Sequence, residues 1–364
     1  MNSHFEAVRL FQKIALVLAL ACALPAGAET AAAAPALQSA PQTGGAASGA
    51  KAAVAPRVAP KPPAVNVASL DYALQPRQIA EGVWVIEGAV EDFSRTNGCN
   101  IINTGFIVTG AGVVVINTGP SRLYGEQQRR AIERITREPV VKVFNLNQHP
   151  DYFFGNQAWP EFPAQALAGS IAGMQAEGQS YAANMYRLCG DWMKGTEPLP
   201  ASQPVAPQTL QMGTHRLELR RLQGHTSDDL LLLDHNTGVV FVGGLVFSQR
   251  VPTTPHADMV QWLQSLDALD KLLEGFTLTA LVPSHGPVAA DRRGIAQTRD
   301  WLQWVSGVMQ SSAQHGLDLS EVLQTPLPER FQHWAAQPAE LHRTLTQWYP
   351  VEERRALTQT LPAK

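Results

Sequence analysis

The part of the sequence expected to fold, from residue 68 onward, lacks a cluster of lysine and arginine residues. The formal net charge of the whole chain is −3, from 28 basic and 31 acidic residues. Proteins bind the phosphate backbone of nucleic acids through a concentrated basic face. We therefore do not expect nucleic acid to be a partner of this protein.

The sequence also lacks an apolar run long enough to span a bilayer, which takes about 20 residues. The run Ile14–Leu24 has eleven residues. Arg9 and Lys13 precede it, and the small residues 26–28 follow it, which is typical of a secretory signal peptide. The sequence therefore predicts that residues 1–28 are a signal peptide, that the mature protein is periplasmic and that it has no stable membrane span.

Cysteine is scarce, with three residues in 364. Cys22 lies in the apolar run, so lipidation is an alternative there, although the residues before it match a lipobox poorly. A buried N-terminal helix is another alternative for this segment. Removal of residues 1–28 leaves Cys99 and Cys189, which could pair as a disulfide in an oxidising compartment. Two separate buried thiols are the other interpretation.

Residues 29–67 contain no aromatic residue and are rich in alanine, proline and glycine. Such a segment cannot bury enough apolar surface to offset the entropy of its chain. We predict a disordered linker here. It is followed by one domain at residues 68–292 and by a C-terminal helical extension, residues 293–364, packed on that domain.

Short apolar strands and helical segments alternate from residue 68 in two similar halves. The expected strands are 82–86, 100–108, 112–116 and 140–144, then segments within 208–222, 229–234, 238–243 and 279–282. The expected helices are 123–136, 169–186 and 257–274, followed by further helices in the C-terminal extension. This order predicts an α/β fold, an αββα sandwich in which helices flank two mixed β-sheets.

Three histidines each follow an apolar strand and lie beside a glycine or in a loop. His149 lies in the loop after strand 140–144, His225 in Gly224-His225-Thr226, and His285 in Ser284-His285-Gly286. Loops at the ends of strands present side chains to substrates. These histidines are therefore candidates for a shared site.

This ordered set resembles the metallo-β-lactamase superfamily over residues 78–290. The resemblance depends on His149-x-Asp151, Gly224-His225-Thr226, Asn117-Thr118-Gly119 and Ser284-His285-Gly286. It implies the αββα sandwich and a hydrolase that binds two zinc ions. Asn117 stands where the family usually has the Asp of an Asp-Thr-Gly motif.

The family's first zinc is held by both histidines of an H-x-H-x-D-H loop and by the His of a later G-H-T turn. Its second zinc is held by the Asp and last His of that loop, by a later bridging Asp and by a final His. Four of these ligands are kept here, namely His149, Asp151, His225 and His285. The other three positions carry Asn147, Tyr152 and Gly244.

The kept ligands divide two and two between the family's metal positions. A catalytic zinc usually has three protein ligands and a water. Because the two positions lie only about 3.5–4 Å apart, one zinc ion held by all four kept ligands is the sharpest hypothesis. Asn147 and Tyr152 are candidate substitute ligands. His256 is a third candidate substitute ligand. The alternative is that its side chain only packs at the start of a helix.

A bound ion would lower the pKa of its water and polarise the substrate, and Asp151 would act as the catalytic residue that orients or deprotonates that water. The resemblance implies hydrolysis of a small ester, thioester or amide-like substrate. The alternative is a degraded site in which these side chains only hydrogen-bond the loops. Asp228 and Asp229, after His225, are interpreted as caps or solvated charges, and His215 and His235 as surface residues.

Residues 97–105, 150–152 and 251–258 are similar to a narrower group, the exported zinc metallohydrolase-like proteins of quinoprotein relay systems. This similarity implies a role beside a periplasmic quinoprotein (PQQ-dependent) dehydrogenase. Two hypotheses follow. The first is a metal-dependent hydrolase with a small-molecule substrate. The second is an accessory or binding protein that has lost hydrolysis.

Overall fold

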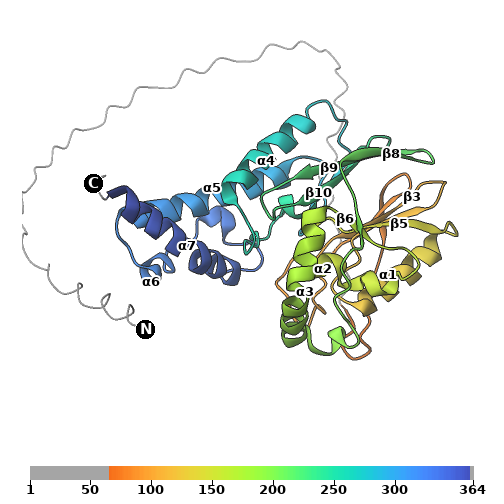
Figure 1. Cartoon of the computed structure of the whole chain (residues 1–364), viewed down its shortest axis with the longest axis horizontal. Coiled ribbons are helices and arrows are strands. Elements are labelled where there is room, and N and C mark those ends of the chain that lie inside the picture. Colours follow the sequence, from red (N-terminus) through yellow and green to blue (C-terminus); the bar gives the residue numbers. More distant parts are fainter. Residues whose placement is uncertain (1–64, 361–364) are drawn as a thin grey trace, which may run out of the picture. The chain divides into compact units, whose positions relative to one another are not determined.

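The computed structural model describes residues 65–360, which belong to one compact unit, Val58–Lys364. The predicted signal peptide, and all but the last three residues of the predicted linker, lie outside the described residues. Within the described range no helix is both long and apolar enough to cross a membrane. The predicted sandwich of two mixed sheets and flanking helices is confirmed (Figure 1).

The first sheet has seven strands in the order β1 to β7. Neighbours from β1 to β4 are antiparallel, and neighbours from β4 to β7 are parallel. The strands are β1 (Arg77–Ala80), β2 (Val83–Ile86), β3 (Thr104–Val108), β4 (Val113–Ile116), β5 (Val140–Phe144), β6 (Gln165–Ala166) and β7 (Gln203–Pro204).

The second sheet has five strands in the order β12-β11-β10-β9-β8, in which β11 and β12 are parallel and the others antiparallel. The strands are β8 (Gln208–Met212), β9 (His215–Leu222), β10 (Asp229–Asp234), β11 (Val239–Phe241) and β12 (Ala280–Val282). The hairpin between β8 and β9 turns at Gly213, whose φ is +53°.

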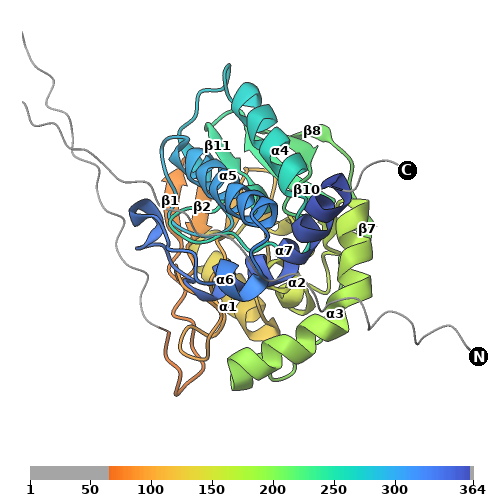
Figure 2. The ribbon, with the colours of Figure 1, turned by 90° about the vertical axis from the view of Figure 1, so that its left-hand side faces the viewer.

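Helices cover the outer faces of both sheets, α1 and α3 on the first, α4 and α5 on the second (Figures 1 and 2). The α-helices are α1 (Arg122–Ile135), α2 (Pro150–Phe153), α3 (Ala168–Cys189), α4 (Met259–Leu272), α5 (Arg293–Gln314), α6 (Leu319–Val322) and α7 (Ala339–Thr360). Four short 3₁₀ turns complete the elements, at Phe154–Ala158, Gly190–Met193, Gly243–Leu245 and Glu329–Phe331.

Three apolar layers hold the sandwich together. The central layer joins the facing sides of the two sheets, for example Ile116 on β4 and Leu232 on β10. The outer layers place α1 and α3 against the first sheet and α4 and α5 against the second. Alternate residues of β10 belong to different layers, since Leu232 faces the first sheet while Leu231 and Leu233 face the helices. This alternation is what a strand buried on both faces requires.

Two predicted strands are shorter than expected by more than one residue. The strand predicted at 100–108 begins at Thr104. Asn103, just before it, donates its backbone N–H to the carbonyl of Ser284 in a distant loop and not to a neighbouring strand. The strand predicted at 238–243 ends at Phe241. Gly243, with a φ of +54°, turns the chain there into a 3₁₀ turn that contains Gly244.

The interpretation of His215 as a surface residue was wrong. Its side chain is buried, and its Nδ1 lies 2.7 Å from Oδ2 of the buried Asp234.

Asp228 and Asp229 are buried as well, so neither is a solvated charge. Asp228 accepts the backbone N–H of Gly169 at the start of α3, at 2.6 Å, and therefore caps that helix.

A disulfide joins Cys99 to Cys189, and both residues are fully buried. Of the two alternatives left by the sequence, the structure has the paired one. The bond connects the loop before β3 to the last residue of α3, two segments that are 90 residues apart in the chain.

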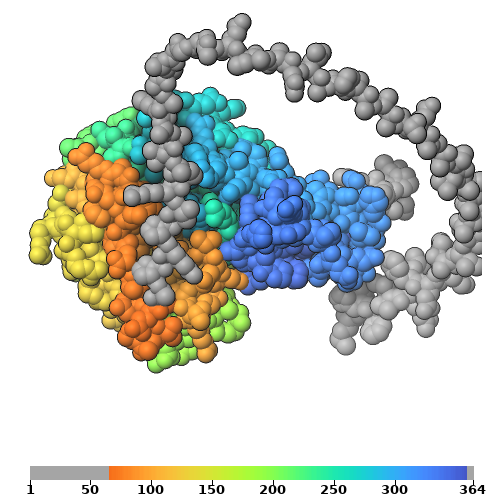
Figure 3. Space-filling view, turned by 180° about the vertical axis from the view of Figure 1, so that it is seen from behind, coloured from red at the N-terminus to blue at the C-terminus, as the bar shows by residue number. Residues whose placement is uncertain are grey.

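The C-terminal helices pack against the second sheet and reach the N-terminal sheet. Leu341, Leu345 and Tyr349 of α7 are part of the core that α5 shares with the second sheet. Arg343 of α7 pairs with Asp92, in the loop after β2, at 3.0 Å. The space-filling view shows the dark blue helices beside orange N-terminal residues (Figure 3).

Candidate functional site

The loop that follows β5 is held rigidly by amide side chains. Asn117, with a φ of +57°, accepts the backbone N–H of Leu146 at 3.0 Å. Asn145 donates to the Tyr152 carbonyl at 2.9 Å. These bonds, together with the short helix α2, fix the backbone from which His149 and Asp151 project into the interior.

His149 and His225 face each other directly. His225 Nε2 lies 3.0 Å from His149 Nδ1. Burial lowers the pKa of both imidazoles well below the usual value, and His256 lowers both further through its charge. Among the described residues, His225 Nδ1 has no hydrogen-bond partner of normal geometry. The backbone of Thr253 nevertheless opposes part of the lowering of the His225 pKa.

Asp151 and His285 form a second facing pair, with Asp151 Oδ2 3.4 Å from His285 Nε2. His285 Nδ1 lies 2.8 Å from the Ile101 carbonyl, so its ring proton sits on Nδ1 and its Nε2 is an acceptor. Two acceptors facing each other need a proton or a cation between them. Burial raises the pKa of Asp151 to about 7, and a proton on Asp151 satisfies this contact.

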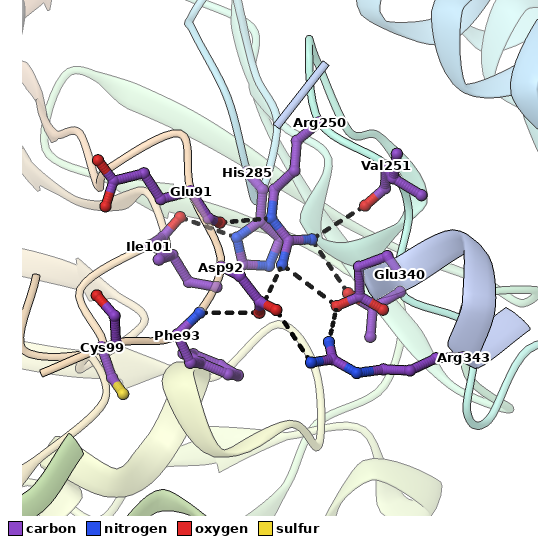
Figure 4. A network of polar contacts seen from close by, with 12 residues as sticks. Glu91, Asp92, Phe93, Cys99, Ile101, Arg250, Val251, His285, Glu340 and Arg343 are labelled. Atoms are coloured by element: carbon purple, nitrogen blue, oxygen red, sulfur yellow. Dashed lines mark hydrogen bonds and ion pairs between the residues drawn. The ribbon is translucent and has the colours of Figure 1, made fainter. Parts of the chain in front are cut away.

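The ring of Phe247 contacts a histidine of each pair, and the buried Arg250 lies beside them. Phe247 stacks on His285, with ring centroids 4.9 Å apart, and meets His225 edge-on at 5.3 Å. The guanidinium of Arg250, which is 1% exposed, lies between Asp92 and Glu340 beside the His285 ring (Figure 4). Burial lowers the pKa of His285 well below its usual value, and the positive charge of Arg250 lowers it further. The same charge opposes part of the rise that burial causes in the pKa of Asp151.

Comparison with known families decides the identity of this fold. The model of the Metallo-beta-lactamase superfamily matches residues 97–285, more than half of the chain. The chain belongs to this superfamily. A metallo-beta-lactamase from Pontibacter korlensis has a similar structure, with a TM-score of 0.52 and 21% identity, covering 63% of this chain and 99% of that one. Metallo-beta-lactamase IND-7 is similar too, with a TM-score of 0.51, 17% identity and coverage of 63% and 98%.

Asn147, Tyr152 and Gly244, which the sequence motifs align with metal ligands of the superfamily, are all buried. Asn147 donates to Asp229 Oδ1 at 2.5 Å and accepts the His149 backbone N–H at 3.0 Å, so both ends of its amide are engaged. Tyr152 is fully buried, and burial raises the pKa of its phenol. A side chain at Gly244 has no room, because its Cβ would overlap His225 Cδ2 and lie 3.1 Å from Asn147 Nδ2.

These donors do not fit the superfamily's two-zinc centre. Each facing pair offers two donors, whereas a catalytic zinc takes three protein ligands. The His225 ring occupies the space that a bridging carboxylate at Gly244 would need. In residues 65–360, no three His, Cys, Asp or Glu side chains are grouped to hold one ion. Both ends of the Asn147 amide are engaged by hydrogen bonds, and His256 contacts the nitrogen of His149 that faces away from His225.

Three residues of the site, Arg250, Trp262 and Glu177, lay outside the sequence-based candidates. Arg250 and Trp262 are fully buried, and the Trp262 ring lies 5.0 Å from that of His225. Glu177 of α3 reaches His256 at 2.8 Å. Buried Asp229 accepts the Thr226 backbone N–H at 3.0 Å and so shapes the turn at His225. Asp229 is the first residue of β10, at the start of the strand predicted at 229–234.

Asp151→Asn is expected to remove part of the pH dependence of stability. The pKa of Asp151 is about 7 in the folded protein, against about 3.9 in an unfolded chain. Because the folded state binds this proton more tightly, the parent loses stability as the pH rises from about 4 through 7, by about 3 kcal/mol between pH 5 and pH 8. Asparagine cannot ionise, so the variant lacks this loss.

Urea unfolding of the parent and of Asp151→Asn at pH 5 and pH 8 measures the difference. Asp229, whose pKa burial also raises to about 7, remains in both proteins and contributes equally to both. Identical pH profiles for the two proteins would contradict the prediction.

Proposed function

We propose that this protein is an exported accessory or binding protein that keeps the metallo-beta-lactamase fold without the two-zinc hydrolytic centre. The observation that carries the proposal is the position of the His225 ring. It lies against Gly244, where the bridging carboxylate would be, and its Nε2 is engaged by His149. Both contacts support the loss of the superfamily's usual chemistry.

Export to the periplasm is part of the proposal. The N-terminal segment has the pattern of a signal peptide. The Cys99–Cys189 disulfide supports an oxidising compartment, since such bonds are rare in the cytosol. The similarity of residues 97–105 and 251–258 to the quinoprotein-associated group supports a periplasmic PQQ-dependent dehydrogenase as the partner. Titration calorimetry with such a purified dehydrogenase tests this partnership.

A second candidate function is hydrolysis of a small ester, thioester or amide-like substrate through a single zinc ion. It is favoured by one observation, the facing acceptors Asp151 Oδ2 and His285 Nε2. A cation between them would satisfy this pair as well as a proton does.

Metal analysis of protein purified from the periplasm separates the two functions. We expect well below one equivalent of zinc in the parent, because no three His, Cys, Asp or Glu side chains converge within residues 65–360. We also expect no ester or thioester hydrolysis that a chelator abolishes. His225→Ala is expected to leave the metal content unchanged. His235→Ala is the matched control, since His235 pairs with Glu218 away from the site.

One equivalent of zinc in the parent and in His235→Ala, lost in His225→Ala together with chelator-sensitive hydrolysis, would overturn the proposal. The single-zinc hydrolase would then stand in its place.

A further inference from the structure

A cleft of about 470 Å³ lies between the loop before α4 and the helix α7. Its size falls within the range of small-molecule sites, about 300–1,000 Å³. Thr253, Thr254 and Pro255 line it from the loop, and none of its lining residues is a candidate metal ligand. Helix α7 lies outside residues 97–285, which the superfamily model matches. The cleft therefore depends on a part of this chain beyond the matched residues.

Hydrogen bonds join the two walls of the cleft. Thr254 Oγ1 and Thr344 Oγ1 lie 2.9 Å apart in the interior. Trp348 Nε1 donates to the Thr254 carbonyl at 3.0 Å, and the Gln347 amide donates to the Pro255 carbonyl at 2.6 Å. The loop and the helix are thus fixed relative to each other, which lowers the ordering cost of binding a ligand between them.

The wall of the cleft contains a carboxylate with one unused oxygen. Glu340 lines the cleft and is 2% exposed. Arg250 and Arg343 both contact its Oε1, at 3.5 Å and 2.8 Å (Figure 4). Its Oε2 has no hydrogen-bond partner in residues 65–360. A buried acceptor without a donor is unfavourable, so the cleft suits a ligand that brings a hydrogen-bond donor.

The charges around Glu340 favour a donor that is neutral. Arg250 and Arg343 each contact both Glu340 and Asp92, so two positive charges balance two negative ones. An ammonium group at Oε2 would be repelled by the two guanidinium groups, and an anion would be repelled by the carboxylate itself. A hydroxyl group donates a hydrogen bond without adding a charge.

The rest of the cleft favours a ligand larger than water. One water molecule would satisfy Oε2, but it takes up only about 30 Å³. Most of the wall of the cleft is apolar and would stay in contact with solvent. A molecule with an apolar body removes this surface from water. His342, Thr346 and Gln347 at the rim are exposed, so the cleft is open to the solution.

We propose that this cleft binds a small neutral molecule with an apolar body and a hydroxyl group, and that the hydroxyl donates to Glu340 Oε2. The C-terminal helix α7 thereby adds a small-molecule site beside the superfamily fold. This inference goes beyond the proposed function, because it requires neither a metal ion nor a protein partner.

Benzyl alcohol and three compounds with the same ring test the proposal. Titration of the nitrogen-15-labelled full chain, followed by NMR, measures each dissociation constant. Benzyl alcohol is expected to bind about tenfold more tightly than benzyl methyl ether, which cannot donate a hydrogen bond. Benzylamine and benzoate, which carry a positive and a negative charge, should both bind more weakly than the alcohol.

Thr346→Trp places a large ring in the cleft from an exposed position on α7. This variant is expected to lose the binding of benzyl alcohol. Thr358→Trp is the matched control, because Thr358 is exposed on the same helix and does not line the cleft. It should bind benzyl alcohol as the parent does.

Glu340→Gln tests which atom receives the hydroxyl. Its one carbonyl oxygen is needed by Arg250 and Arg343, so its NH₂ group faces the cleft and donates where Oε2 accepted. The preference for the alcohol over the ether should then be lost. Circular dichroism verifies that each variant is folded, and the two tryptophan variants decide the matter if Glu340→Gln does not fold.

Three results would overturn the proposal. The first is equal behaviour of the parent and Thr346→Trp towards benzyl alcohol, whether both bind it or neither does. The second is tighter binding of benzylamine or benzoate than of the alcohol. The third is a folded Glu340→Gln protein that keeps the full preference for the alcohol. None of these readouts involves zinc, hydrolysis or a dehydrogenase, so this site and the proposed function can fail separately.

Discussion

Replacement of both Cys99 and Cys189 by alanine is expected to lower the free energy of unfolding by about 4–5 kcal/mol. The disulfide closes a loop with a sequence separation of 90 residues. In the chain-entropy model, opening a loop of this size restores freedom to the unfolded state worth about that amount. Both sulfurs are buried, so the two smaller side chains also leave unfilled space.

Urea unfolding of the oxidised parent and of the double variant measures this loss. The parent kept in dithiothreitol is the control, because it loses the same cross-link without any change in sequence. The two should lose similar stability. A double variant within about 1 kcal/mol of the oxidised parent would show that the bond contributes little to folding.

Arg250→Met is expected to destabilise the protein by about 3–5 kcal/mol, because removal of one partner leaves the other charges of a buried network without their counter-charge. The Arg250 guanidinium donates to the Glu91 carbonyl at 2.9 Å and lies 3.5 Å from Glu340 Oε1. Glu340 is 2% exposed, and burial already raises the pKa of its carboxyl. Without Arg250, this carboxyl loses its buried counter-charge (Figure 4).

Arg343→Met is the matched control for Arg250→Met. Arg343 contacts the same two carboxylates, Glu340 at 2.8 Å and Asp92 at 3.0 Å, but its side chain is 54% exposed. Exposed ion pairs are worth about 0–1 kcal/mol. Chemical denaturation of both variants should therefore separate a large loss from a small one. Equal losses would show that burial of Arg250 is not what makes it important.

The fold could be predicted because its elements follow local patterns. The apolar runs of β4, β5 and β10 and the periodicity of α1 and α4 need no knowledge of distant residues. One boundary that was wrong depends on a backbone turn. The strand β11 ends just before the turn at Gly243, whose φ is +54°, although apolar residues continue beyond it, and the sequence gives no clear sign of this turn.

The site was harder to predict because it depends on contacts between distant segments. The sequence motifs named His149, Asp151, His225 and His285, and the structure brings them together as two facing pairs. Glu177 lies in a helix without strong apolar periodicity and 79 residues from His256. Arg250 is a charged residue in a loop, and nothing in its neighbours along the chain indicates that it is buried.

The contact between Gly244 and His225 constrains how a bridging carboxylate could be introduced at position 244. A carboxylate placed at 244 on its own meets the imidazole before it can meet any ion. Rotation of that imidazole on its own breaks the bond to His149. Neither change alone makes room for a bridging ligand and keeps the contact between the two histidines. Introduction of such a ligand therefore requires both positions to be altered together, and single substitutions selected one at a time would each be unfavourable.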